Sequence, residues 1–243
     1  MAFDETTFIN RVEKWQRAEP GELAPNFHSL KAVNGNLLDQ QFVTVDSWDL
    51  TDLAELQNSD IEAMFLWMAL DDFQKSTISF EPILEVETTT GTRKFLEFSN
   101  NVFQNLGQTE PVPTPFVTNT RAVWRRLEPE KIAEAFTNRN PNGAERVRYF
   151  KIEGIGLDWI KALLPYAISF RVLPGIDLNK ATDDMEVTFV PIINVTVPTL
   201  SATGMTEAHG KHLHGFGWSV LEDGDDEVYF DYSRPCPPVC NNH

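Results

Sequence analysis

The sequence predicts an α+β fold in which a mainly antiparallel sheet is covered by helices. Residues 168–176 and 185–197 alternate apolar and polar side chains around a polar link, so they predict an antiparallel hairpin with one buried face. A second alternating pair, residues 77–87 and 93–98, flanks a threonine-rich turn and predicts another hairpin. Residues 6–17 place apolar side chains at helical spacing, which predicts an amphipathic helix that packs on such a sheet.

The first 75 residues are predicted to be mainly helical. After the first helix, residues 41–45 alternate as a short strand, and residues 49–56 and 59–73 are expected to form two further helices. Ser59 is followed three residues later by Glu62, which is the pattern of a capping box. The run AMFLWMAL then places apolar residues on more than one face, so the second of these helices is expected to be a buried central one.

The middle of the chain contains a candidate boundary. Residues 108–120 include TEPVPTP, whose three prolines predict an extended linker. Pro129 is expected to begin a helix that ends near Phe136, and residues 147–152 and 156–164 predict a short strand and another helix.

The expected organisation is one α+β domain over residues 1–243 with a short flexible tail from residue 233. Subdivision into two domains near 108–120 is the alternative. A chain of 243 residues is long enough to bury a large core in either arrangement.

Composition and charge limit the partners. The net charge of −16 repels nucleic acid and anionic membrane surfaces, so neither is an expected partner, whereas a protein partner or self-association is. The one basic cluster, RAVWRR at residues 121–126, is expected to pair with acidic residues of the same chain. The start MAFDETTFINRVEKW has no uninterrupted apolar core, which argues against a secretory signal and predicts a cytoplasmic protein.

Three histidines form the first candidate metal site. His209, His212 and His214 lie within six residues, and imidazole binds zinc or iron well. On a strand, His212 and His214 would point to the same side, and the glycine at position 210 would let His209 join them. Glu207 could add a carboxylate ligand or act as a base.

The C-terminal tail is the second candidate. Cys236, Cys240 and His243 place three potential zinc ligands close together. A polyproline path would separate the two cysteines by ~12 Å, so a disulfide between them requires a turn. A tail with reduced thiols and no ligand is the alternative.

One resemblance concerns the last part of the chain. A helix reading GLDWIKALL, strands reading ISFRVLPGID and MEVTFVPIIN, and a tail reading CPPVC resemble a group of uncharacterised bacterial proteins. The likeness covers residues 147–197 and the tail, and it implies a small α+β region with a terminal Cys-Pro-Pro-x-Cys. It implies no activity, and this chain differs from the pattern by three residues after the last cysteine.

The sequence therefore predicts a non-enzymatic binding or assembly protein that acts through a sheet surface or an edge strand. No phosphate-binding loop, dinucleotide-binding motif or hydrolase motif occurs in the sequence. The alternative is a metal-dependent enzyme that uses the histidines at 209–214.

Overall fold

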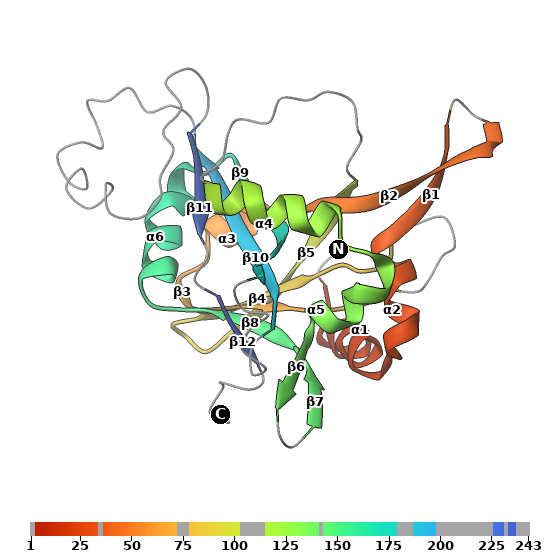
Figure 1. Ribbon diagram of the computed structural model, residues 1–243. Coiled ribbons are helices and arrows are strands. Elements are labelled where there is room, and N and C mark those ends of the chain that lie inside the picture. Colours follow the sequence, from red (N-terminus) through yellow and green to blue (C-terminus); the bar gives the residue numbers. More distant parts are fainter. Residues whose placement is uncertain are drawn as a thin grey trace.

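The computed structural model describes residues 3–33, 36–71, 78–102, 115–140, 143–178, 187–197, 226–230 and 233–236 (Figure 1). Its helices are α1 Glu5–Arg17, α2 Pro20–Phe27, α3 Leu53–Gln57, α4 Pro115–Arg125, α5 Ile132–Ala135 and α6 Ile155–Leu163. Its strands are β1 His28–Val33, β2 Asn36–Leu50, β3 Ile61–Trp67, β4 Ile83–Thr88, β5 Arg93–Val102, β6 Thr137–Asn140, β7 Gly143–Arg146, β8 Tyr149–Ile152, β9 Ser169–Ile176, β10 Phe189–Val197, β11 Asp226–Phe230 and β12 Ser233–Cys236.

Ten of the described strands form one sheet, in the order β11-β10-β9-β2-β5-β4-β3-β8-β12, with β1 paired to β2. The strand pairs within this sheet are antiparallel, and so is the separate pair of β6 and β7. The prediction of an α+β fold with an antiparallel sheet is therefore confirmed. Strands on the two sides of residues 108–120 pair directly, β2 with β9 and β3 with β8.

The hairpin predicted at residues 168–197 is formed by β9 and β10, with Ser169 opposite Thr196 and Ile176 opposite Phe189. The prediction that only one of its faces is buried was wrong, because β10 is buried along its whole length. Helix α4 covers the second face of this hairpin, where Val117 packs with Val190 and other apolar residues. Leu173 of β9 and Ile192 of β10 belong to the same cluster under α4, whereas Ser169 and Arg171 at the start of β9 are half-buried.

The helix predicted at residues 59–73 is a strand instead. Residues 61–67 form β3, which lies between β4 and β8 in the sheet. Met64 and Leu66 face the core, while Phe65 and Trp67 on the other side are half-buried. A strand with apolar residues on both faces has the same composition as a buried helix, which explains the error. Ser59 does not cap a helix there, and its hydroxyl donates to the carbonyl of Glu55.

Two other boundaries differ from the prediction. Strand β2 continues to Leu50, and the helix expected at residues 49–56 begins only at Leu53, where the Asp52 carboxylate accepts a hydrogen bond from the Glu55 amide. Residues 115–120 belong to α4, so that part of the predicted extended linker is helical. The helices expected at residues 6–17 and 156–164 are confirmed as α1 and α6.

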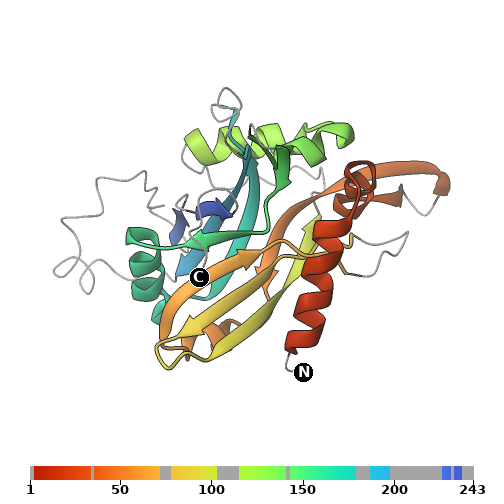
Figure 2. The same cartoon turned by 90° about the horizontal axis from the view of Figure 1, so that it is seen from below.

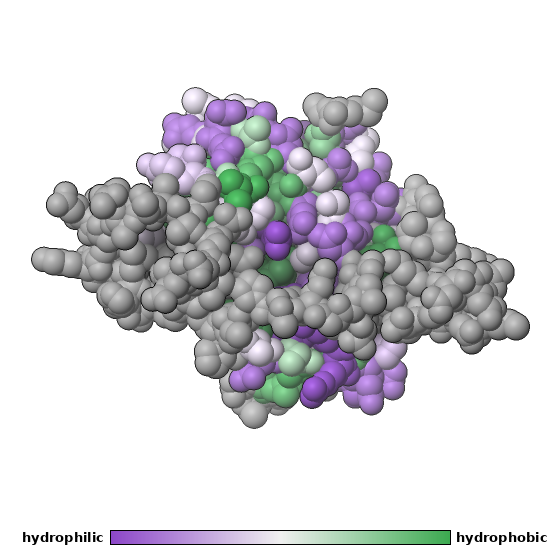
Figure 3. All heavy atoms as spheres, turned by 90° about the horizontal axis from the view of Figure 1, so that it is seen from above, coloured by the Kyte–Doolittle hydropathy of each residue, from purple (hydrophilic) through white to green (hydrophobic). Residues whose placement is uncertain are grey.

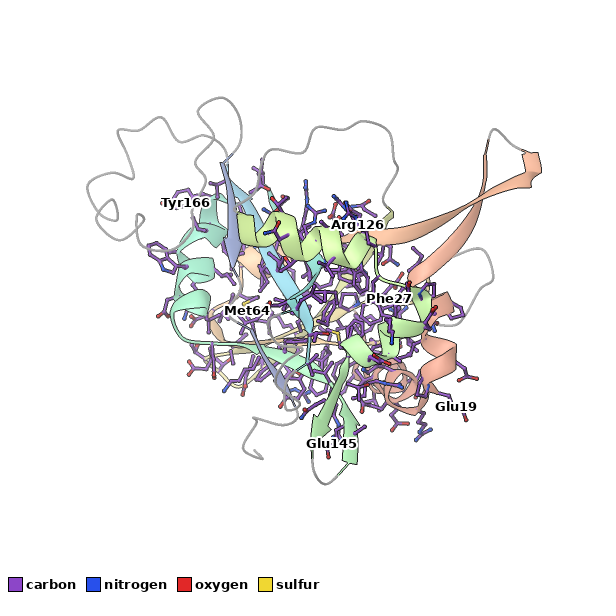
Figure 4. The ribbon with its side chains drawn as sticks, viewed as in Figure 1. Glu19, Phe27, Met64, Arg126, Glu145 and Tyr166 are labelled. Carbon is purple, nitrogen blue, oxygen red and sulfur yellow. The ribbon has the colours of Figure 1, made fainter. Side chains whose placement is uncertain are left out.

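Aromatic side chains fill the centre of the core. Phe27 stacks on Phe80 with ring centroids 4.2 Å apart, and Phe136 stacks on Phe189 at the same distance. Figure 4 shows Phe27 and Met64 inside the molecule, whereas Glu19, Glu145 and Tyr166 lie at its periphery. Within the described part of the chain, no helix is long and apolar enough to cross a membrane.

Candidate functional site

Strand β1 and the first half of β2, residues 28–33 and 36–44, form a two-stranded ribbon that projects from the rest of the sheet (Figures 1 and 2). The two strands are in antiparallel register from His28 opposite Thr44 to Ala32 opposite Gln40. Among the described residues, Asn36 and residues 40–44 of β2 pair with β1 alone, because the pairs of β2 with β5 and β9 begin only at Val45. We call residues 28–33 and 36–44 the ribbon.

An extra residue marks the point where the ribbon leaves the sheet. In the register of β2 with β5, Val45 lies opposite Val102 and Ser47 lies opposite Asn101, so Asp46 has no partner of its own. Such a bulge bends a strand, increases its twist and redirects the side chain. The bulge at Asp46 thus explains both the departure of the ribbon and the direction of the Asp46 carboxylate toward α4.

Two arginines of α4 hold this carboxylate. The Arg121 guanidinium Nη2 lies 2.9 Å from Asp46 Oδ2, and the Arg125 Nη2 lies 2.7 Å from Asp46 Oδ1. The Arg121 side chain is only 7% exposed and the Asp46 side chain 19% exposed, so water screens these pairs weakly. The expectation that the basic cluster pairs with acidic residues of the chain is confirmed for these two arginines.

Trp124 completes the contact between α4 and the base of the ribbon. Its indole Nε1 donates a hydrogen bond to the carbonyl of Val45 at 2.9 Å, and the side chain is 2% exposed. The ring meets Phe27 and Phe136 edge-on in the core. A tryptophan this deeply buried has no face free to stack on a base of a nucleic acid. We call Asp46, Arg121, Trp124 and Arg125 the clamp.

The ribbon differs in composition from the rest of the chain. Lys31 and Asp39 are its only charged residues, and it contains no proline, in a protein of net charge −16. Natural sheets protect exposed strand edges with lysines, prolines or covering elements, because unpaired backbone groups pair readily with another strand. The sequence of the ribbon contains one lysine and no proline, so these two kinds of residue give it little protection.

A second group of charged side chains lies where α1 packs against the sheet. Arg11 contacts Asp71 at 3.2 Å, Glu97 at 3.1 Å and Glu81 at 3.5 Å. Burial raises the pKa of Glu81 to about 7, opposed by the positive charge of Arg11 and reinforced by Asp71 and Glu97. The amide of Asn100 donates to Glu81 Oε1 at 3.1 Å. We call Arg11, Asp71, Glu81 and Glu97 the carboxylate cluster.

Two cavities flank this cluster. One of about 630 Å³ is bordered by Glu97, Lys94 and Arg93, and one of about 490 Å³ by Asp71, Lys14 and Asn26. The cations in the first cavity are already paired, Arg93 with Glu5 and Glu85 and Lys94 with Glu55. The positive charges that line the first cavity are thus neutralised within the protein, and they indicate no particular ligand.

The sequence-predicted metal sites fall largely outside the described residues. His209, His212, His214, Cys240 and His243 all lie there, as does Glu207. Cys236 ends β12, where its backbone lies opposite Tyr149 of β8, so the first four residues of the expected tail form a strand. The described part of the chain holds no group of three or more His, Cys, Asp and Glu that could bind a metal ion. Binding of zinc or iron by the histidines or by the tail stays a prediction.

The ribbon and the clamp were missed by sequence reasoning, although one signal pointed to each. The strand expected at residues 41–45 is part of a longer strand, Asn36–Leu50, and the arginines of RAVWRR suggested an acidic partner without identifying Asp46. No family model, curated protein or solved structure matches the chain in comparisons with known proteins.

Proposed function

We propose that the chain is a non-enzymatic assembly protein of the bacterial cytoplasm that associates with a second copy of itself through the ribbon. One observation supports this proposal above the others. Within the described residues the ribbon has no sheet partner beyond its own two strands, yet its base is fixed to the body by a bulge and a clamp. In this proposal the helices shelter the body of the sheet, and the ribbon is the part that associates.

The backbone of the ribbon favours a partner strand. A two-stranded hairpin is marginally stable in water, whereas three or more strands give each other support. The clamp holds the ribbon at Val45 and Asp46, which leaves the positions farther along it without that support. Addition of a strand from another chain would pair the free backbone groups of the edge.

Charge favours a second copy meeting at the ribbon. Each copy has a net charge of −16, so contact between the parts of the two copies outside the ribbon would bring many like charges together. The ribbon has one positive and one negative residue and is neutral overall. Because it projects from the body, pairing at the ribbon separates the two bodies, and salt screens charges beyond about 8 Å. Two identical edges that pair antiparallel also form a closed twofold dimer.

The exposed side chains of the described residues favour association through an edge rather than through a broad apolar face. In the coloured part of the view from above, hydrophilic residues dominate and the apolar areas between them are smaller (Figure 3). The large apolar side chains exposed among the described residues are Ile9, Tyr166, Ile168 and Leu178. Large contiguous apolar patches are the usual mark of association through a face.

A shortened ribbon tests the proposal. Replacing residues 30–42 by Asn-Gly leaves Ser29 opposite Val43, joined by a two-residue turn, and keeps the clamp intact. Sedimentation equilibrium is expected to give a dimer for the full chain and a monomer for the shortened variant. Equal midpoints of denaturant unfolding at low protein concentration serve as the control for folding. A monomeric full chain, or a dimeric variant, would contradict the proposal.

Metal content separates this proposal from the metal-dependent enzyme. We expect the purified dimer to carry no stoichiometric zinc or iron, and the His212→Ala, His214→Ala double variant to dimerise as the original chain does. One equivalent of metal that is lost in the double variant would favour the enzyme instead.

A further inference from the structure

Helix α1 is anchored firmly at its C-terminal half. Trp15 is fully buried in the main core, and its indole Nε1 donates to the carbonyl of Val147 at 2.7 Å. The Arg146 guanidinium donates to the carbonyl of Trp15 at 2.6 Å and lies over the indole ring. Displacing this half of α1 would open the core and leave buried polar groups unpaired.

The N-terminal half of α1 packs on a different and smaller cluster. Phe8 stacks on Phe95 with centroids 4.2 Å apart and meets Trp67 edge-on at 5.3 Å. These residues form a cluster with Ala69 and Ile83 that is separate from the main core. Figure 2 shows α1 lying beside β3, β4 and β5 on this side of the sheet. The apolar contact of this half is therefore confined to a few side chains.

The carboxylate cluster joins the middle of α1 to the sheet. One guanidinium, that of Arg11, contacts three carboxylates: Asp71 after β3, Glu81 before β4 and Glu97 in the middle of β5. The backbone amide of Leu70 also donates to the carbonyl of Arg11 at 3.1 Å. The Arg11 side chain is 14% exposed and that of Glu81 is 25% exposed. Water therefore weakens the interactions between these charges only in part.

We propose that the N-terminal half of α1, residues 5–12, is a displaceable cover over Trp67 and Phe95, held by the carboxylate cluster and hinged before Trp15. Residues 5–12 alone are too short to form a stable helix, so this half unwinds when it lifts. Its displacement uncovers aromatic side chains and leaves the main core closed. The ring centroids of Trp67 and Tyr149 are 4.4 Å apart, and those of Tyr149 and Phe65 are 5.6 Å apart. The uncovered rings would therefore join an aromatic row that is already half-exposed on the same face of β3 and β8.

Protons control the cover through Glu81. In the closed state this carboxyl is faced by Arg11 and Asn100, which favour its charged form, and by Asp71 and Glu97, which oppose it. Burial gives it a pKa of about 7, compared with a usual value of 4.5. When α1 lifts, water returns to the carboxyl and its pKa falls, so the open state releases a proton. The open population therefore grows as the pH rises from about 5 to 8, by roughly 50- to 100-fold.

Amide hydrogen exchange of the full chain tests the proposal. After correction for the intrinsic exchange rates, the amides of residues 8–12 are expected to lose protection by roughly 50- to 100-fold between pH 5 and pH 8. The amides of Arg17 and Ala18 are expected to keep theirs, because their acceptors, the carbonyls of Glu13 and Lys14, lie outside the lifted half. In Glu81→Gln, which stays neutral, residues 8–12 are expected to remain protected at pH 8. Glu62→Gln, at an exposed glutamate of β3, is the matched control and is expected to behave as the original chain.

Three results would overturn the proposal. Protection of residues 8–12 that does not change with pH would show that no proton-linked opening occurs. Parallel loss of protection at Arg17 and Ala18 would show that α1 moves as a whole, without a hinge. A Glu81→Gln profile equal to that of the original chain would show that another group titrates. The first two results require no variant, so a failure of Glu81→Gln to fold leaves the test intact.

Discussion

The indole Nε1 of Trp124 donates a hydrogen bond to the carbonyl oxygen of Val45, 2.9 Å away, at the residue where β2 leaves the sheet. The contact joins α4 to the base of the ribbon. Beside it, Arg121 and Arg125 hold Asp46, the bulge residue. A neutral hydrogen bond and two charged contacts thus fix the direction in which the ribbon departs.

Removal of the indole N–H of Trp124 measures how much its hydrogen bond to Val45 contributes to stability. In Trp124→Phe the buried carbonyl of Val45 loses its donor while most of the aromatic packing remains, so the free energy of unfolding is expected to fall by about 1–3 kcal/mol. Denaturant titration at fixed pH gives this value. An unchanged free energy of unfolding would mean that water or another donor replaces the indole.

Neutralisation of Asp46 measures how much the ion pairs of the clamp contribute to stability. Asp46→Asn leaves the guanidinium of Arg121, which is 7% exposed, without its carboxylate at 2.9 Å, so a loss of about 2–4 kcal/mol in the free energy of unfolding is expected. Asp158→Asn in the first turn of α6 is the matched control and is expected to cost less than about 1 kcal/mol, from the helix dipole alone. Equal effects of the two substitutions would show that the clamp contributes little to stability.

The close packing of α4 against β9 requires a glycine at position 175. A Cβ at this position would lie 3.1 Å from Ile192 Cδ1 and 3.1 Å from Thr120 Cβ, so Gly175→Val would push α4 away from the hairpin. We expect it to lower the free energy of unfolding by about 1–3 kcal/mol. Gly21→Ala in α2 meets no atom within 4 Å and is expected to stabilise the protein by about 0.5–1 kcal/mol. Thermal or denaturant unfolding of both variants measures the contrast, and a Gly175→Val variant as stable as the original would contradict the close packing.

Global stability should also depend on the protonation of Glu81. Its pKa is raised in the folded protein, so the stabilising proton is fully bound below pH 4.5 and is lost as the pH rises through about 7. From this group alone, the free energy of unfolding is expected to fall by about 1–3 kcal/mol between pH 5 and pH 8. Subtracting the pH profile of Glu81→Gln isolates this part. A difference profile that is flat, or that rises with pH, would contradict the assigned pKa.

The sequence predicted the fold class because two hairpins have long and regular alternation. Residues 169–176 and 189–197 pair as expected, and so do residues 83–88 and 93–102. The prediction failed at β3, where apolar side chains on both faces conceal the period of a strand, and a capping pattern at Ser59 favoured a helix. It also failed on the second face of β10, because the helix that covers it begins some seventy residues earlier in the chain.

The candidate site was harder to predict for a related reason. Asp46 and Arg121 are 75 residues apart, and the carboxylate cluster joins side chains of α1, of the segment between β3 and β4, and of β5. No local pattern marks such groups before the strands are placed in order. The histidines at 209–214 have a recognisable local pattern, but they lie outside the described residues.

Distances between spin labels test the central claim most directly, in a background in which Cys236 and Cys240 are replaced by serine. The side chain of a strand residue stands perpendicular to the sheet, so a label at Lys31→Cys leaves the edge of β1 free to pair. If two copies pair through the ribbon, pulsed dipolar spectroscopy is expected to give an intermolecular distance below about 25 Å, since β1 is only six residues long. A label at the exposed Glu145 of the β6–β7 hairpin, away from the ribbon in Figure 1, is expected to show no such short distance. The absence of an intermolecular distance at position 31, or equally short distances at both positions, would contradict assembly through the ribbon.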